Sequence, residues 1–196
     1  AAIDVNRLMT AGQPSGPWTL TIADDAGGRT VTTNRASSMG GKLNISPVDL
    51  TAQEDGRLFV WSGPARLSLD GPAADFTRQL NNAFALRLDL RVDQIGGQVR
   101  LGFAGKSLDI APLLRRMPRG ALATLKVPLR CFAEVGASVA SVGTPMVIEA
   151  DRGTQFALRS AVVEAVGESL ACPVRENAGI RAGRFSAPVS PFAGRE

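Results

Sequence analysis

The sequence predicts an all-β domain, namely a two-layer antiparallel β-sandwich with one or two short helices. The strongest evidence is the segment AFALRLDLRVD, residues 83–93, in which apolar and charged side chains alternate. Successive side chains of a strand point to opposite faces, so this pattern predicts one buried face and one polar face. The chain also contains 12 Pro and 21 Gly, which fits many strands joined by turns. Its 196 residues suffice to bury a core without a metal or a disulfide.

Strands and turns can be placed in order along the first half of the chain. Residues 1–16 are interrupted by Gly and Pro, so they are predicted to be a linker or entry segment before a sandwich domain over residues 17–172. Residues 36–42 are predicted to be a loop of small residues. Segments with β-branched or alternating apolar residues predict strands at 18–24, 29–33, 57–61 and 65–70. Residues 173–196 have few apolar anchors and are expected to be a tail, flexible or docked on a parent enzyme.

The second half adds more strands and two short helical segments. Gly96 and Gly97 are predicted to form a hairpin turn between the alternating strand and a strand over residues 99–103. Asp109 is predicted to cap a short helix over residues 110–117. The remaining elements are a helical turn at 131–135 and strands at 123–127, 146–150 and 155–166.

The composition argues against several classes of function. The net charge is only +4 and the basic residues are dispersed, so nucleic-acid binding is not expected. No apolar run reaches the roughly 20 residues that span a bilayer, and the start at Ala1 shows no signal-peptide pattern, which we interpret as a cut inside a longer polypeptide. The chain has no His, which excludes Ser-His-Asp triads and His-ligated zinc. Carboxylates are then the acid and base groups available, and a glycosidase pair has no local signature, so catalysis by this chain itself is not expected.

The two cysteines, Cys131 and Cys172, leave two alternatives open. They are too few for a disulfide scaffold and are not spaced like a metal-binding pair. Cys131 lies in the apolar context LRCFAEV, which is typical of a free buried cysteine. A disulfide between them requires Cα atoms within about 7 Å, which a sequence does not show.

Several segments carry a resemblance to a known family. They are WSGPARLSLDG, FTRQLNNAFALRLDLRVD, KSLDIAPLLRRMP and LATLKVPLRCFAEVGASVASVGTPMVIEADRGTQFALRSAVV, within residues 57–166. In this order they resemble the carboxy-terminal domain attached to some bacterial family 3 glycoside hydrolases, the exo-β-glucanases and β-glucosidases that act on 1,3- and 1,4-linked glucans. The more specific parts are VPLRCF and LDIAPLLRR. The resemblance implies a jelly-roll β-sandwich of the galactose-binding-domain-like type, similar to carbohydrate-binding modules.

The resemblance also implies a role. The catalytic residues of such enzymes lie on preceding domains, which implies that this chain is a noncatalytic accessory domain that binds or positions β-glucan or an oligosaccharide. The alternative is a structural domain that packs on the catalytic domains of the parent polypeptide without binding sugar. An independent hydrolase is the third class left open. Because polysaccharides lie outside the cytoplasm, the resemblance implies a periplasmic or secreted protein.

Sugar recognition needs an aromatic platform and forked polar groups. Trp61 ends a predicted strand before a Ser-Gly-Pro turn, so its ring either lines a groove or fills the core. The polar candidates share predicted strand faces; they are Arg87, Asp89 and Arg91, joined by Arg66 and Arg100 if neighbouring strands align. The alternatives for this polar set are a solvated ion-pair ladder worth less than about 1 kcal/mol, or a face that docks on the catalytic domains.

No cofactor is expected, with one open alternative. Sandwich domains of this kind often hold a structural calcium ion in a loop of carboxylates and carbonyls. Asp24, Asp25 and Asp151 lie in predicted turns that suit such a site. They lack a spaced ligand pattern, so the sequence does not assign a metal.

Overall fold

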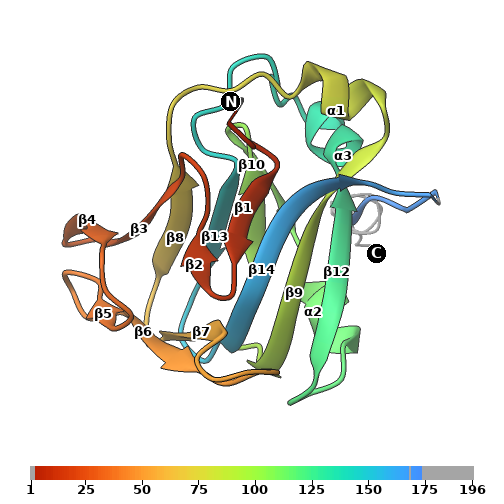
Figure 1. Cartoon of the computed structure of the whole chain (residues 1–196). Coiled ribbons are helices and arrows are strands. Elements are labelled where there is room, and N and C mark those ends of the chain that lie inside the picture. The colour runs from red at the N-terminus through yellow and green to blue at the C-terminus, as the bar shows by residue number, and fades with distance from the viewer. Residues whose placement is uncertain (1–2, 168, 174–196) are drawn as a thin grey trace, which may run out of the picture.

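Figure 1 shows the computed structural model of the chain, which describes residues 3–167 and 169–173. Within those residues the strands form two antiparallel sheets, which we call sheet A and sheet B. Their inner faces share one apolar core. The predicted all-β sandwich is therefore confirmed.

Sheet A has eight strands in the described part of the chain. Its main spatial order is β12 (Leu122–Pro128), β9 (Phe84–Gln94), β14 (Gln155–Ala165), β7 (Gly56–Trp61), β6 (Leu43–Val48) and β5 (Ala36–Ser37). The long strand β14 also pairs with β1 (Arg7–Thr10), and β1 pairs with β2 (Gln13–Pro14).

Strands β1 and β2 lie within residues 1–16, for which the sequence predicted a linker or entry segment. Leu8 and Met9 of β1 are buried in the core. Gly12, at the turn between the two strands, has a φ of 78° and donates its amide to the carbonyl of Arg159 over 2.8 Å. A Cβ at Gly12 would come within 2.8 Å of the backbone of Gly56, so only glycine allows this close approach. The Gly and Pro that suggested a linker mark a short hairpin.

Sheet B has six strands among the described residues. Its spatial order is β11 (Lys106–Asp109), β10 (Arg100–Phe103), β13 (Met146–Ala150), β8 (Ala65–Asp70), β3 (Thr19–Asp24) and β4 (Gly27–Val31). Because β9 belongs to sheet A and β10 to sheet B, the predicted hairpin at Gly96 and Gly97 is wrong. That segment crosses from one sheet to the other, and a Cβ at Gly96 would lie 2.2 Å from the carbonyl oxygen of Arg152.

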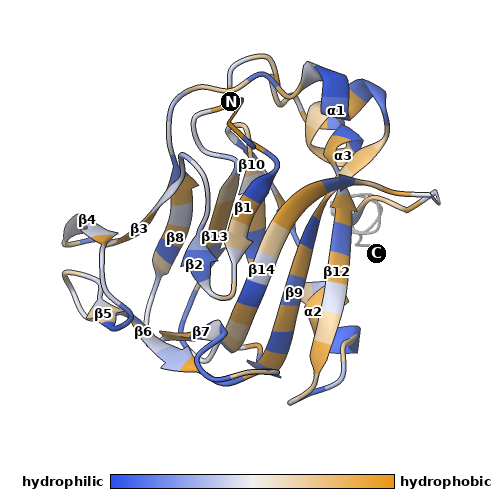
Figure 2. Ribbon diagram, viewed as in Figure 1, coloured by the Kyte–Doolittle hydropathy of each residue, from blue (hydrophilic) through white to orange (hydrophobic). Residues whose placement is uncertain are grey.

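The core follows from the alternation of side chains along the strands. Figure 2 shows orange and blue bands alternating along β14, β9 and β12. Between the sheets, the ring of Trp61 lies 5.2 Å from that of Phe156, and the ring of Phe59 lies 5.9 Å from that of Phe156. This aromatic cluster and the surrounding Leu, Ile and Val side chains are removed from water, which is the main force that holds the sheets together.

Three short helices complete the described part of the chain: α1 (Thr77–Asn81), α2 (Ala111–Arg116) and α3 (Leu129–Glu134). The helix predicted near residues 110–117 is present as α2, and Asp109 accepts a hydrogen bond from the amide of Ala111 over 3.0 Å at its start. Helices α1 and α3 lie together at one end of the sandwich (Figure 1). In the portion that the structure describes, no helix has the length and apolar character needed to cross a bilayer.

The segment after β14 is fastened to α3. Cys131 of α3 and Cys172 form a disulfide with a Cα–Cα distance of 5.4 Å. Arg130 adds hydrogen bonds from its guanidinium to the carbonyl of Leu170 and, over 3.1 Å, to the Cys172 sulfur. Most of the predicted tail, residues 174–196, lies outside the described residues.

Candidate functional site

The residues predicted to bind sugar do not form one site. Arg87, Asp89 and Arg91 lie on β9, on the outer face of sheet A, whereas Arg66 of β8 and Arg100 of β10 lie on sheet B. The expected alignment of these strands is therefore wrong. The sequence pattern identified outward-facing side chains correctly, but it carries no information on which sheet each strand joins.

Trp61 is a core residue and not a sugar platform. Its side chain is only 2% exposed, and its indole nitrogen donates a hydrogen bond to the carbonyl of Ala65 over 2.9 Å. A pyranose stacks on a ring face that is open to solvent, and both faces of this ring are enclosed by the core cluster. The alternative that placed Trp61 in the core is the correct one.

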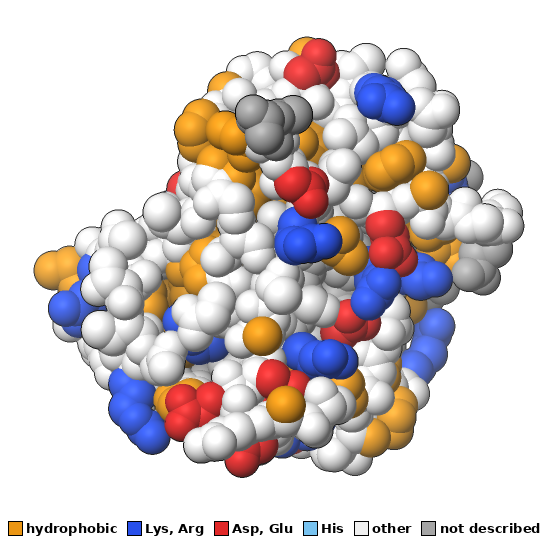
Figure 3. All heavy atoms as spheres, in the orientation of Figure 1, with side chains coloured by type: hydrophobic (Ala, Val, Ile, Leu, Met, Phe, Trp, Pro, Cys, Tyr) orange, Lys and Arg blue, Asp and Glu red, His pale blue; other side chains and the backbone are white. Residues whose placement is uncertain are grey.

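The sheet A candidates form a hydrogen-bonded ladder. Arg87 donates to Asp89 over 2.6 Å and to Glu164 over 2.9 Å. Asp89 also accepts from the hydroxyls of Thr124 over 2.8 Å and Ser160 over 2.5 Å. Figure 3 shows neighbouring acidic and basic side chains on this face. Because these groups satisfy one another, the face offers few free donors or acceptors to a ligand.

A second pair on β9 repeats this arrangement with fewer partners. Arg91 donates to Asp93 over 2.9 Å and 3.0 Å, in a bidentate contact. Gln155 of the neighbouring strand β14 adds one hydrogen bond to Asp93 over 3.1 Å. Arg87, Asp89 and Arg91 are thus ion-paired, as in the predicted ladder, but Asp89 is buried and not solvated.

Asp89 is expected to stabilise the fold through its charge. Burial raises its pKa, but the hydrogen bonds from Arg87, Ser160 and Thr124 outweigh this effect and leave the pKa below the ordinary value of 3.8. A carboxyl with a lowered pKa in the folded state stabilises the protein above its unfolded pKa, and this contribution disappears as the pH falls through the folded pKa. We expect Asp89→Asn to lower the free energy of unfolding at pH 7 by about 1.5–3 kcal/mol.

Urea unfolding of wild type and variants between pH 7 and pH 2 checks this prediction. The difference in unfolding free energy between wild type and Asp89→Asn should become smaller at acid pH, because the wild-type carboxyl is then neutral as well. Asp93→Asn is the matched control on the same strand, and its effect should be smaller because the Asp93 side chain is 20% exposed, against 10% for Asp89. A difference in unfolding free energy that is equal at pH 7 and pH 2 would contradict the role given to the Asp89 charge.

The outer face of sheet B presents a different arrangement. Arg66 of β8, Glu149 of β13 and Arg100 of β10 lie in register on adjacent strands, and we call them the Glu149 row. Cross-strand neighbours of this kind have Cβ atoms roughly 5 Å apart. Arg66 and Glu149 are exposed, and neither side chain forms a hydrogen bond or ion pair within the described residues. Arg100 donates to the hydroxyl of Ser107 over 2.9 Å and to its carbonyl over 3.3 Å.

Cavities adjoin the Glu149 row on three sides. One of about 520 Å³ lies on the β10 side and includes Gly97, Arg100 and Arg152 in its wall. One of about 450 Å³ lies on the β3 side, with Arg66, Asp24 and Lys42. A smaller one of about 190 Å³ runs along β10 and β13 toward Lys106. Glu149 lines all of them, so it is the centre of this surface.

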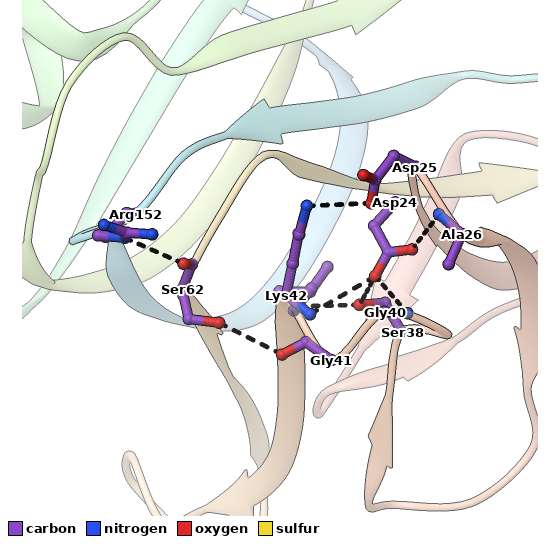
Figure 4. Close-up of polar contacts among 10 residues, drawn as sticks. Asp24, Asp25, Ala26, Ser38, Gly40, Gly41, Lys42, Ser62 and Arg152 are labelled. Carbon is purple, nitrogen blue, oxygen red and sulfur yellow. Dashed lines mark hydrogen bonds and ion pairs between the residues drawn. The ribbon is translucent and has the colours of Figure 1, made fainter.

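The turns at this end of the sandwich hold further polar groups (Figure 4). The Asp24 carboxylate accepts hydrogen bonds from the Ser38 hydroxyl over 2.6 Å and the Gly40 amide over 2.7 Å. These bonds, led by that of Ser38, hold the pKa of Asp24 below its ordinary value. Lys42 pairs with Asp25 over 3.0 Å, on the rim of the 450 Å³ cavity. The Asp24 interactions join the end of β3 to the loop between β5 and β6, and so fix one wall of the site.

The candidate calcium ligands do not gather at one point. Asp24 is occupied by hydroxyl and amide donors, and Asp151 accepts a hydrogen bond from the amide of Arg152 over 2.6 Å. Within residues 3–167 and 169–173, no group of three or more acidic, Cys or His side chains could hold a metal ion. In that part of the chain, Asp24, Asp25 and Asp151 therefore do not form a cluster of carboxylates for the calcium that the sequence left open.

Three residues that line this surface were not predicted from the sequence, namely Glu149, Lys42 and Arg152. Glu149 is the charged residue in the otherwise apolar strand MVIEA, and such an isolated charge on a predicted strand marks an outward-facing position. Lys42 and Arg152 lie in turns, and their approach to Glu149 depends on tertiary structure. Only the first of these residues had a signal in the sequence.

Aromatic side chains contribute little to this surface. The Trp and Phe side chains in the described part of the chain are buried, except that of Phe84, which is half-buried. Phe84 lines a separate cavity of about 510 Å³ beside Pro128 and Arg130, near α1 and α3. Any ligand at the Glu149 row must therefore be held mainly by polar groups.

Comparison with known proteins identifies the fold and the family. Among solved structures, the extra C-terminal domain (X) of the exo-1,3/1,4-β-glucanase from a Pseudoalteromonas species superposes with a TM-score of 0.70 at 20% identity, over 86% of this chain and 98% of that one. The whole enzyme from the same organism gives a TM-score of 0.72 at 20% identity, over 90% of this chain and 23% of that one. These identities establish a shared fold. No curated protein matches the chain.

The family model Exop_C, described as galactose-binding domain-like, matches residues 16–162. The predicted resemblance is thus confirmed over most of the chain. The matched residues run from β3 to most of β14, so they include the Glu149 row and the turns beside it. The chain belongs to the Exop_C family of galactose-binding-like domains.

Proposed function

We propose that this chain is a noncatalytic accessory domain of an exo-β-glucanase and that it binds β-glucan at the Glu149 row. One observation supports binding at this place. The side chains of Arg66 and Glu149 are exposed and have no partner among the described residues, and cavities lie on either side of them. The structural match to a C-terminal domain of an exo-1,3/1,4-β-glucanase supports the accessory role.

The chemistry of the Glu149 row suits a neutral sugar. Each sugar hydroxyl both donates and accepts a hydrogen bond, so a row of donor, acceptor and donor groups complements adjacent hydroxyls. Guanidinium groups supply forked donors from a planar group, and Glu149 supplies acceptors. Without ring stacking, we expect weak binding with a favourable enthalpy, because polar contacts dominate.

A second candidate function is structural support of the catalytic domains. The lack of an exposed aromatic ring among the described residues favours it, as does the broad outer face of sheet A, on which polar groups satisfy one another. A domain with this function alone would pack on its neighbour through that face and would bind no glucan.

We also propose that the protein works outside the cytoplasm. Disulfides persist in oxidising compartments such as the periplasm or the extracellular space. The Cys131–Cys172 bridge supports that location.

Calorimetric titration of the 196-residue chain with laminari- and cello-oligosaccharides tests the proposal. We expect exothermic binding with a Kd of about 1 mM or tighter, no binding to an α-linked dextran, and no turnover of glucans or aryl glucosides. Absence of binding, together with a parent enzyme that unfolds more easily when this domain is deleted, would favour structural support instead. Turnover by the purified chain would contradict the noncatalytic role.

A further inference from the structure

We infer that the ligand at the Glu149 row is an internal stretch of a neutral β-glucan chain, several sugars long, that lies across β3, β8, β13 and β10. This inference rests on the proposed function and specifies which part of the polysaccharide is bound. It also assigns the central contact to Glu149.

The length of the ligand follows from the arrangement of the cavities. The cavities of about 520 and 450 Å³ share Pro64, Glu149 and Ala150 as a common wall. Each already falls within the roughly 300–1,000 Å³ that small ligands occupy. A chain that contacts Glu149 therefore has room to continue on both sides, and a disaccharide would leave much of this surface empty.

The outer face beside the Glu149 row is recessed because its side chains are short. The next row along the same strands is in register with it and consists of Thr21, Ser68, Val147, Gly102 and Ser107. A Cβ at Gly102 would lie 3.2 Å from the Cβ of Val147, so the lack of a side chain at Gly102 leaves this part of the outer face lower than its surroundings. The charged row thus stands above a hollow in the sheet, which the 190 Å³ cavity occupies.

The far end of the surface is open and does not enclose a chain terminus. Gly97 lines the 520 Å³ cavity, and a Cβ placed there would meet no atom within 4 Å. Arg152 lines the same cavity and is exposed, with one guanidinium hydrogen bond to the Ser62 carbonyl over 3.2 Å. A site built for the end of a chain needs a closing wall, which the described residues do not provide at this end.

The charge of Glu149 selects a neutral chain. Its carboxylate makes no hydrogen bond or ion pair with a side chain of the described residues, so a uronate or sulfate group placed directly against it would meet a like charge. A hydroxyl group instead donates to it. Arg66 and Arg100, on either side, then donate to the oxygens of neighbouring sugars.

Titrations with a series of neutral oligosaccharides, from disaccharide to hexasaccharide, test the inference on the full chain. We expect the hexasaccharide to bind at least about tenfold more tightly than the disaccharide. We expect Glu149→Gln to weaken hexasaccharide binding about tenfold or more and to narrow the discrimination against an oligouronate of equal length. Glu164→Gln is the matched control, because it removes the same charge on the opposite sheet. It should leave hexasaccharide binding unchanged.

The outcomes separate this inference from the function on which it rests. If wild type binds glucan but Glu149→Gln binds equally well, the assignment to this surface is overturned and the accessory role stands. If disaccharide and hexasaccharide bind alike, the inferred length of the ligand is overturned and the accessory role again stands. If wild type binds no glucan of any length, the proposed function fails and the inference fails with it. Arg66→Lys gives a second readout, since a loss of affinity in this variant at constant charge supports forked contacts by the guanidinium.

Discussion

Replacing Trp61 by alanine is expected to lower the free energy of unfolding by about 3–5 kcal/mol. The side chain is 2% exposed and packs between the rings of Phe59 and Phe156, with centroid distances of 6.3 and 5.2 Å. Removal of the indole leaves a cavity in the centre of the sandwich and leaves the carbonyl of Ala65 without its donor. Urea unfolding followed by circular dichroism measures the effect, and the fluorescence of Trp18, the other tryptophan, reports the same transition.

Trp61→Phe is the control that separates packing from sugar binding. It keeps a ring in the aromatic cluster and removes the indole nitrogen, so we expect a loss of only about 1–2 kcal/mol and glucan affinity equal to that of wild type. It also serves where Trp61→Ala does not fold. A Trp61→Phe protein of normal stability that no longer binds glucan would show that the ring contacts sugar after all.

The fate of Trp61 shows where a sequence pattern stops being informative. The segment RLFVW is apolar at most positions, so its periodicity does not tell which side chains point inward. In β9 the charged residues alternate strictly with apolar ones, and both faces of that strand were predicted correctly. Alternation of apolar and charged residues thus predicts which side chains point inward only where the two faces of a strand differ in chemistry.

The pattern of apolar and charged residues also does not predict which of the two sheets a strand joins. Arg66 and Arg87 both lie on outward faces of well-predicted strands, yet they belong to opposite sheets. The short link through Gly96 and Gly97 has the composition of a hairpin, but it crosses between the sheets. In the fold, Gly96 lies against the carbonyl of Arg152, a contact between residues far apart in the chain that the sequence does not reveal.

Of the predicted polar residues, Arg66 and Arg100 lie in the Glu149 row, whereas Arg87, Asp89 and Arg91 lie on the other sheet. Charge alone does not reveal whether a group is already paired. Arg87 and Asp89 stood out through their spacing, and that spacing is what lets them bind each other. Glu149 is isolated in its strand, and its cross-strand neighbour Arg66 does not pair with it. Free polar groups are the ones available to a ligand, and in this chain they are the ones with the weaker sequence signal.

Removal of the Cys131–Cys172 disulfide is expected to cost about 4 kcal/mol of unfolding free energy. The two cysteines are 41 residues apart, and closing a loop of that length lowers the entropy of the unfolded chain. The loop contains β13 of sheet B and β14 of sheet A, so the bridge limits how far strands of both sheets separate when the protein unfolds. Urea unfolding of wild type with and without a reductant, and of the double variant Cys131→Ala/Cys172→Ala, measures this contribution.

The double variant makes the test specific. Reductant should shift the unfolding midpoint of wild type toward that of the variant and leave the variant unchanged. Intact mass measured after thiol alkylation, with and without reduction, should show two additional modified thiols only after reduction. If unreduced protein is alkylated at both cysteines, or if reductant leaves the wild-type midpoint in place, the bridge does not stabilise the native protein. In that case the hydrogen bond from Arg130 to the carbonyl of Leu170 would still join α3 to this segment.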